Sequence, residues 1–236
     1  MRMPNCRTGI VNEIHIPVDI GRLDGSLFIP ENARGLVLFA HGSGSGQNSP
    51  RNALVAAQLH ARAIGTLLFD LLTPVEDGLY RNRFDIDLLC RRLQVAKAWV
   101  RDIDIAAALP LGLFGASTGA AAALRAAAEI GDEVRALVSR GGRPDLAGDE
   151  TLGKTVAPTL LLVGGRDTSV IALNREAFAR MNCEKQLRVI PGASHLFDEP
   201  GTLEQVAQQA AEWFEQHLPH ASPPALSTGV VREPEH

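Results

Sequence analysis

The stretch that decides the fold is Leu111-Gly-Leu-Phe-Gly-Ala-Ser-Thr-Gly119, which runs into the alanine-rich segment Ala120 to Ala128. An apolar run of strand length leads directly into a helical segment, and the turn between them fits the pattern Gly-x-Ser-x-Gly. A serine hydroxyl is a poor nucleophile, and a sharp strand-to-helix turn holds it out of the sheet. Gly115 and Gly119 leave room for so tight a bend. The stretch therefore predicts a buried strand that ends at an exposed nucleophile, Ser117.

The helix that begins here directs its free N–H groups at the place where an oxyanion would form. The backbone N–H of Thr118 is therefore the first predicted oxyanion donor. Glycine-serine-glycine runs also occur at ordinary tight turns, so the pentapeptide alone leaves a purely structural role open. The residues that follow later strands decide between the two interpretations.

Two further side chains follow apolar runs at the expected places. Asp167 comes directly after the run Thr159 to Val163, and His195 comes directly after the run Leu187 to Ile190. An order of Ser, acid and then His, each on a loop after a strand, is typical of hydrolytic α/β proteins. We expect His195 to act as the base and Asp167 to orient it, although Asp167 could instead only cap the next helix.

A glycine-rich segment, His41-Gly-Ser-Gly-Ser-Gly46, follows the apolar run Gly35 to Ala40. Its backbone amides could approach a substrate carbonyl, and the N–H of Ser43 is the predicted second oxyanion donor. We expect His41 to organise this loop by hydrogen bonding and not to act as a base. No lysine follows the glycines, so a phosphate-binding P-loop is not indicated.

Apolar runs of strand length alternate with helical segments along the chain, which favours an α/β fold with a mostly parallel central sheet of about eight strands. Ile10–Val18 and Leu23–Ile29, with an Asp-Gly turn signal at Asp24-Gly25, predict an antiparallel N-terminal edge. The other strands are expected at 35–40, 66–72, 111–116, 135–139, 159–163 and 187–190. Helices on both faces are expected at 49–64, 85–100, 117–130, 171–182 and 202–217, with N-caps at Ser49 and Thr202.

Residues 1–218 are expected to form a single domain, and 219–236 a disordered tail rich in proline, serine and charge. The formal net charge is -4, and the basic residues are scattered. Partners such as nucleic acid or a membrane surface are therefore not indicated. The three cysteines form no Cys-x-x-Cys pair. The sequence favours a cytoplasmic protein without a metal site, and it leaves the oligomeric state open.

These four segments together resemble the α/β-hydrolase superfamily, and within it the dienelactone-hydrolase-like branch. The resemblance covers about 10–218 and is carried by the motifs around His41, Ser117, Asp167 and His195. It implies a serine hydrolase without a cofactor that cleaves an ester, thioester or lactone-like acyl compound through an acyl-enzyme. Enzymes of this fold that open dienelactones use cysteine where this chain has Ser117, so dienelactone itself is not assigned as the substrate.

Two longer connections, 73–85 and 141–154, carry arginines, and another arginine lies just before the second connection. Such side chains could hold a substrate carboxylate. The candidates are Arg81, Arg83 and Arg140. The alternative is that these arginines and Arg143 are solvated or paired with nearby acids such as Asp85 and Asp145. Either connection could cover the site.

Two other functions are compatible with the same fold. The chain could be a non-catalytic binding protein, because function belongs to the site and not to the fold. It could also be an acyltransferase that passes the acyl group to an acceptor other than water. An aspartyl nucleophile is disfavoured, because Ser117 occupies the turn and Asp70 follows a strand without such a turn.

Overall fold

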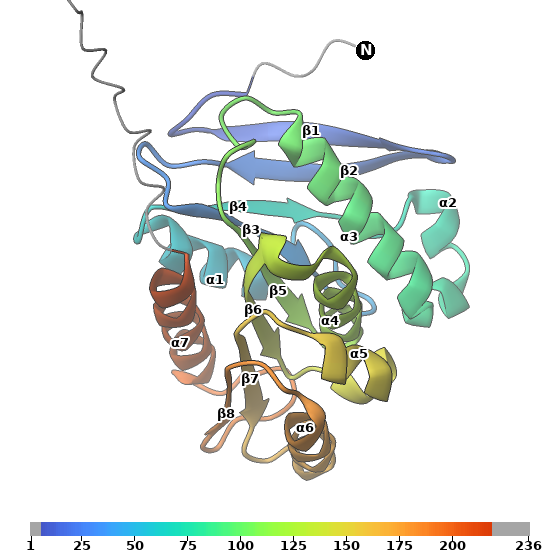
Figure 1. The fold of residues 1–236 in the computed structure, drawn as a ribbon, viewed down its shortest axis with the longest axis vertical. Helices are drawn as coiled ribbons and strands as arrows, with labels where there is room; N and C mark the ends of the chain where they lie inside the picture. The colour runs from blue at the N-terminus through green and yellow to red at the C-terminus, as the bar shows by residue number, and fades with distance from the viewer. Residues whose placement is uncertain (1–5, 219–236) are drawn as a thin grey trace, which may run out of the picture.

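The fold is built on a central sheet of eight strands, in the order β1-β2-β4-β3-β5-β6-β7-β8 (Figure 1). A computed structural model describes residues 6–218. β2 runs antiparallel to both its neighbours, whereas the strands from β4 to β8 pair in parallel. The predicted mostly parallel sheet with an antiparallel N-terminal edge is confirmed. The strands are β1 (Val11–Val18), β2 (Gly21–Phe28), β3 (Gly35–Ala40), β4 (Ile64–Phe69), β5 (Leu111–Ala116), β6 (Val134–Arg140), β7 (Thr159–Gly164) and β8 (Lys185–Ile190).

Helices cover both faces of this sheet, as predicted (Figure 1). One face packs against α1 (Pro50–His60) and α7 (Thr202–His217), and its core includes Phe39, Phe114 and Phe214. The other face packs against a second group of helices. These are α3 (Ile86–Arg101), α4 (Thr118–Ile130), α5 (Asp149–Lys154) and α6 (Thr168–Arg180). The short elements α2 (Pro74–Asp77), η1 (Tyr80–Phe84), η2 (Gly131–Glu133) and η3 (Pro144–Ala147) lie in the connections.

The boundaries differ from the predictions at α1 and at α6, which begins at Thr168 and not at Ile171 and ends at Arg180 and not at Asn182. Ser49 caps α1 as expected, but the helix ends at His60 and not at Ile64. Ala63 then adopts a left-handed backbone conformation with a φ of 55°, and the chain enters β4 directly. Gly65 lies in that strand and does not end the helix. A side chain at this position would press on the Phe28 carbonyl of the neighbouring strand.

The N-cap of α7 is Gly201 and not Thr202. Gly201 has a φ of 78°, a conformation that glycine adopts without strain. The Thr202 hydroxyl donates to the Glu199 carbonyl at 2.7 Å, so it is not available for the predicted capping box.

The parallel strands bring their carboxyl ends to one edge of the sheet, where loops from five strands meet. These loops follow β3, β5, β6, β7 and β8, and they or the strand ends before them carry the candidate site residues other than Arg81 and Arg83, which follow β4. No helix over residues 6–218 has the length and apolarity needed to cross a membrane. That residues 1–218 form one domain remains a prediction, and the tail expected over 219–236 lies outside the described residues.

Candidate functional site

Ser117 stands at the turn between β5 and α4 in a strained backbone conformation. Its φ is 50° and its ψ is -121°, which is uncommon for a residue with a side chain. Such strain persists only where the surrounding structure enforces it, and it is concentrated at functional sites. The Ser117 side chain does not cap the helix, although the residue occupies the N-cap position. The hydroxyl is therefore free for another role.

The two glycines of the motif allow this turn to pack against the sheet. A Cβ on Gly119 would overlap the carbonyl oxygens of Ala40 and His41, and one on Gly115 would lie 2.8 Å from the Ala120 nitrogen. A Cβ on Gly42 would come within 3.0 Å of the Ser117 Cβ. The loop after β3 and the turn after β5 thus approach each other with no space for side chains between them.

His195 and Asp167 form a hydrogen-bonded pair beside this turn. The His195 Nδ1 lies 2.6 Å from the Asp167 Oδ2. Asp167 occupies the N-cap position of α6, but its side chain makes no capping hydrogen bond to the helix. The carboxylate instead faces the imidazole, and its side chain is only 12% exposed. A carboxylate on Nδ1 leaves Nε2 as the nitrogen that can accept a proton.

The loop that carries His195 is held by Glu199. The Glu199 Oε2 accepts hydrogen bonds from the Ser194 N–H at 2.9 Å and from the Ser194 hydroxyl at 3.2 Å. The Ser194 N–H lowers the pKa of Glu199 below its ordinary value, and the charge of Arg166 acts in the same direction. This anchor is not predictable from sequence, because a glutamate four residues after a histidine can have many other roles.

His41 and Asp70 fix the glycine-rich loop to the end of β4. The Gly42 carbonyl lies 2.9 Å from the His41 Nδ1, and the His41 Nε2 accepts the Leu71 N–H at 2.9 Å. Burial lowers the pKa of His41, so this ring is neutral at pH 7 and engaged at both nitrogens. Asp70 accepts the Gln47 N–H at 2.8 Å. His41 organises the loop by hydrogen bonding, as expected.

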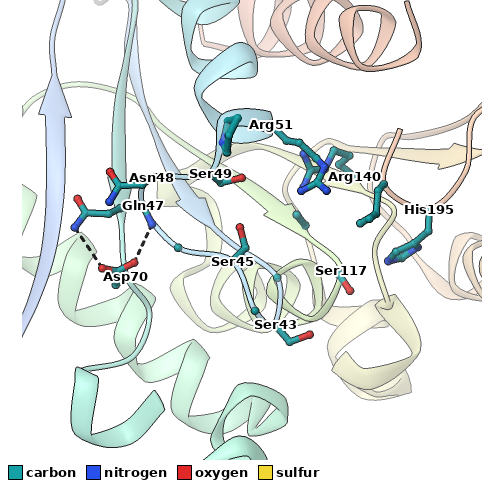
Figure 2. A pocket seen from close by; sticks show the side chains of 16 residues that line it. Ser43, Ser45, Gln47, Asn48, Ser49, Arg51, Asp70, Ser117, Arg140 and His195 are labelled. Carbon is teal, nitrogen blue, oxygen red and sulfur yellow. Dashed lines mark hydrogen bonds between the residues drawn. The ribbon is translucent and has the colours of Figure 1, made fainter. Parts of the chain in front are cut away.

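These segments enclose a cavity of about 640 Å³ (Figure 2). Ser117 and His195 both line it, together with Arg140 from the end of β6. The largest share of the wall is one continuous segment, 42–51, which includes the glycine-rich loop and the first residues of α1. No residue of the connections 73–85 and 141–154 lines the cavity among the described residues, so neither connection covers the site.

The two predicted oxyanion donors lie next to each other, but one of them is already engaged. The Ser43 N–H donates to the Thr118 Oγ1 at 3.2 Å. The Thr118 N–H belongs to the first turn of α4, where no intrahelical acceptor exists. Within residues 6–218, no hydrogen bond joins the Ser117 hydroxyl to the His195 Nε2, although both groups face the same cavity.

The three candidate arginines are placed differently from one another. Arg81 and Arg83 belong to η1 and do not line the cavity, and Arg83 pairs with Asp77 at 2.7 Å. Arg143 makes two hydrogen bonds to Asp145, of 2.9 and 2.7 Å, as the alternative interpretation expected. Arg140 alone among the three candidates lies at the cavity.

Sequence reasoning missed Arg51, which also lines the cavity. It lies in the first turn of α1, directly after the Pro50 that predicted the start of that helix. The start of α1 is predictable from sequence. The approach of α1 to the cavity is not, because it depends on the path of the preceding loop. Within the described part of the chain, no group of three or more His, Cys, Asp or Glu side chains is arranged to hold a metal ion.

Comparison with known proteins places this arrangement in a family. The family model described as an alpha/beta hydrolase domain matches residues 33–218. The crystal structure of a dienelactone hydrolase from Anabaena variabilis is 49% identical, covers 88% of this chain and 98% of its own, and superimposes with a TM-score of 0.85. The chain therefore belongs to the α/β-hydrolase superfamily. Within that superfamily it is a dienelactone-hydrolase-like member.

The chain is also similar to a more distant structure and to two longer proteins. Est1E from Butyrivibrio proteoclasticus shares the fold at 17% identity, with a TM-score of 0.73, over 87% of this chain and 98% of its own. Two Mycobacterium tuberculosis proteins named putative phosphoribosyl transferase are 54% identical over 215 residues, which is 91% of this chain. The chain spans only 48% of their length.

Proposed function

We propose that the protein is a serine hydrolase that cleaves an ester, thioester or lactone-like compound through an acyl-enzyme on Ser117. The observation that carries this proposal is the His195–Asp167 pair, at 2.6 Å, on the same cavity as a strained Ser117. The relationship to a dienelactone hydrolase at 49% identity supports the same reaction class.

In the proposed reaction, the Ser117 oxygen attacks the carbonyl carbon of the substrate and His195 Nε2 takes the hydroxyl proton. Asp167 stabilises the imidazolium that forms. His195 then gives the proton to the leaving alcohol or thiol, and the acyl group stays on Ser117. His195 next removes a proton from water, whose oxygen attacks the acyl-enzyme, and the carboxylic acid leaves as Ser117 regains its proton.

The oxyanion is expected to bind to the N–H groups of Thr118 and Ser43. The Ser43 N–H is held by the Thr118 hydroxyl in the structure. Rotation of that hydroxyl about the Thr118 Cα–Cβ bond releases the amide, and the substrate carbonyl then replaces it as the acceptor. The short approach of Ser117 to His195 is likewise expected to form only with substrate present, as is common in hydrolases.

The proposal is tested with fluorophosphonate labelling and with hydrolysis of p-nitrophenyl esters. Wild type is expected to label at Ser117 and to release p-nitrophenol, whereas Ser117→Ala loses about a thousandfold or more of the rate. Ser26→Ala, a serine on β2 outside the cavity, is the matched control and retains activity. Labelling of Ser117→Ala at the wild-type level would exclude the mechanism.

The two alternative functions give different outcomes in the same experiments. A non-catalytic binding protein shows no ester hydrolysis that depends on Ser117. An acyltransferase shows labelling, but it forms acylated product when a competing alcohol or amine is added to the assay. Phosphoribosyl transfer is not proposed for this chain. The relatives with that name are about twice as long, so their name can refer to the part that this chain lacks. The Ser117 site lies in the part that the proteins share.

A further inference from the structure

Arg140 is a half-buried cation in the wall of the cavity, and part of its guanidinium has no partner in the described part of the chain. Its Nη1 atom is buried and has no hydrogen-bond partner among the described residues. The guanidinium lies over the Phe114 ring, 6.0 Å from the ring centroid. Burial and the charge of Arg51 lower the pKa of Arg140 to about 10, against the opposing charge of Asp198, so the group remains charged at pH 7. An arginine offers five N–H donors, and burying the Nη1 donors without an acceptor is costly.

The sheet register fixes this cation beside the nucleophile. Arg140 pairs with Ala116 across β5 and β6, and its carbonyl accepts the Ser117 N–H at 3.3 Å. Arg140 therefore has two contacts near the nucleophile: its carbonyl holds the backbone of the turn at Ser117, and its guanidinium lines the cavity. A group bound to Arg140 would therefore lie in the same cavity as Ser117.

Arg51 brings a second positive charge to the same place. Figure 2 shows its side chain extending from the start of α1 toward Arg140. Its Nε pairs with Asp198 at 3.2 Å, but the Asp198 side chain is 60% exposed and neutralises Arg51 only weakly. Two neighbouring guanidinium groups repel each other, and an anion bound between them removes that repulsion.

The rest of the wall adds donors and little negative charge. α1 begins at the cavity with the positive end of its dipole, and the hydroxyls of Ser45 and Ser49 belong to the same wall. Asp70 supplies the one carboxylate of the lining among the described residues, and both of its oxygens accept hydrogen bonds from Gln47. The cavity therefore favours an anion.

We propose that Arg140 and Arg51 form a binding site for a phosphate group, and that the acyl substrate of Ser117 carries that group. This proposal rests on the proposed hydrolase function. One guanidinium can already satisfy both oxygens of a carboxylate. Two guanidinium groups and a helix N-terminus fit the three oxygens and the double charge of a phosphate monoester.

The binding part is tested without catalysis. Inorganic phosphate at millimolar concentration is expected to raise the Tm of wild type and of Ser117→Ala. Acetate at the same ionic strength should raise it less. Arg140→Gln and Arg51→Gln should lose the phosphate effect, and Arg83→Gln, which removes an equal charge outside the cavity, should retain it. Arg51 is 31% exposed at its side chain, so this second variant keeps the test valid if Arg140→Gln does not fold.

The substrate part is tested with p-nitrophenyl esters of phosphonoacetate, malonate and propionate, which present a phosphonate, a carboxylate and a methyl group. Wild type is expected to prefer the phosphonate over the neutral ester by about tenfold to a hundredfold in kcat/KM. That ratio should fall toward one in Arg140→Gln and in Arg51→Gln, and Arg83→Gln should leave it unchanged.

The outcomes separate this inference from the hydrolase proposal. A phosphate-dependent Tm that requires Arg140 and Arg51, in a protein that hydrolyses no ester, keeps the anion site and rejects the hydrolase. Hydrolysis that requires Ser117 with no preference for the phosphonate rejects the anion site alone. A preference for malonate over phosphonoacetate, or a larger Tm shift with acetate, overturns the assignment to phosphate.

Discussion

Gly119 shows how little room surrounds the nucleophilic turn. A Cβ at this position would overlap two backbone carbonyls, those of Ala40 and His41, and backbone cannot move aside as a flexible side chain can. Alanine is the better helix former by about 1 kcal/mol, but forced contacts in a packed interior cost about 1–3 kcal/mol. The steric term therefore decides the outcome for a substitution here.

Gly119→Ala is expected to lower the free energy of unfolding by about 2 kcal/mol and to reduce ester hydrolysis, because the turn at Ser117 must shift. Urea unfolding and kcat measure the two effects. Gly153→Ala is the control, since the nearest atom to its added Cβ is 3.9 Å away. Equal stability of the two alanine variants would contradict this account of the turn.

The side chains predicted from sequence are those whose position follows from the sheet alone. Ser117, Asp167 and His195 each follow a parallel strand, and the carboxyl ends of such strands meet at one edge. Arg51 lies on a helix whose approach to the site depends on the loop from Gly42 to Ser49. That loop is set by contacts such as Gln47 to Asp70, which connect residues far apart in the chain.

At the scale of elements, His41 joins the ends of β3 and β4. Its Nε2 accepts the Leu71 N–H, and a protonated imidazole has no lone pair for that role. Burial lowers the pKa of His41 in the folded protein. The unfolded chain therefore binds the proton more readily. The stabilisation is complete above the unfolded pKa of about 6.5 and is lost as the pH falls below it.

The free energy of unfolding is accordingly expected to fall between pH 7 and pH 5, and His41→Asn should reduce the steepness of that fall. Urea titrations at several pH values measure the slope. His60 and His217 also have lowered pKa values through burial, so part of the slope should persist. His15→Asn, a half-exposed histidine on β1, is the control. An unchanged slope in His41→Asn would refute the assignment.

Long periodic elements were predictable, and short ones were not. The strands and the helices α3, α4 and α7 were found within a few residues, because apolar spacing marks them. The connections 73–85 and 141–154 contain α2, η1, η3 and α5. Helices this short bury too few residues to produce a periodic pattern. The predicted end of α1, Ile64, lies four residues beyond the observed end at His60, because composition does not reveal the left-handed conformation of Ala63.

For the whole molecule, Arg92 connects parts that are distant in the chain. It lies on α3 and pairs with Asp19, in the turn between β1 and β2, at 2.9 Å. It also contacts Glu76 of α2, and the side chains of Arg92 and Glu76 are each only 6% exposed. Glu76 in turn caps α2 through Thr73. The edge of the sheet and two helices therefore share one ion-pair network.

Arg92→Met is expected to destabilise the fold by about 3 kcal/mol or more, because it leaves the Glu76 carboxylate buried without a cation. Arg92→Met combined with Glu76→Gln should recover much of that loss, since the amide can still cap α2 without a charge. Urea unfolding of both variants gives the comparison. A double variant no more stable than the single one would show that the pair does not act as a unit.

The cavity wall has a consequence for how this scaffold can change. Most of the lining comes from the uninterrupted segment 42–51, while Ser117, Asp167 and His195 are held by other strands. Under the proposed function, this one segment would set much of the substrate preference, while it also carries the oxyanion donor Ser43 and leaves Arg140 to β6. Grafting residues 44–51 between dienelactone-hydrolase-like proteins, with Gly42 and Ser43 kept, should therefore change specificity and leave the chemistry in place.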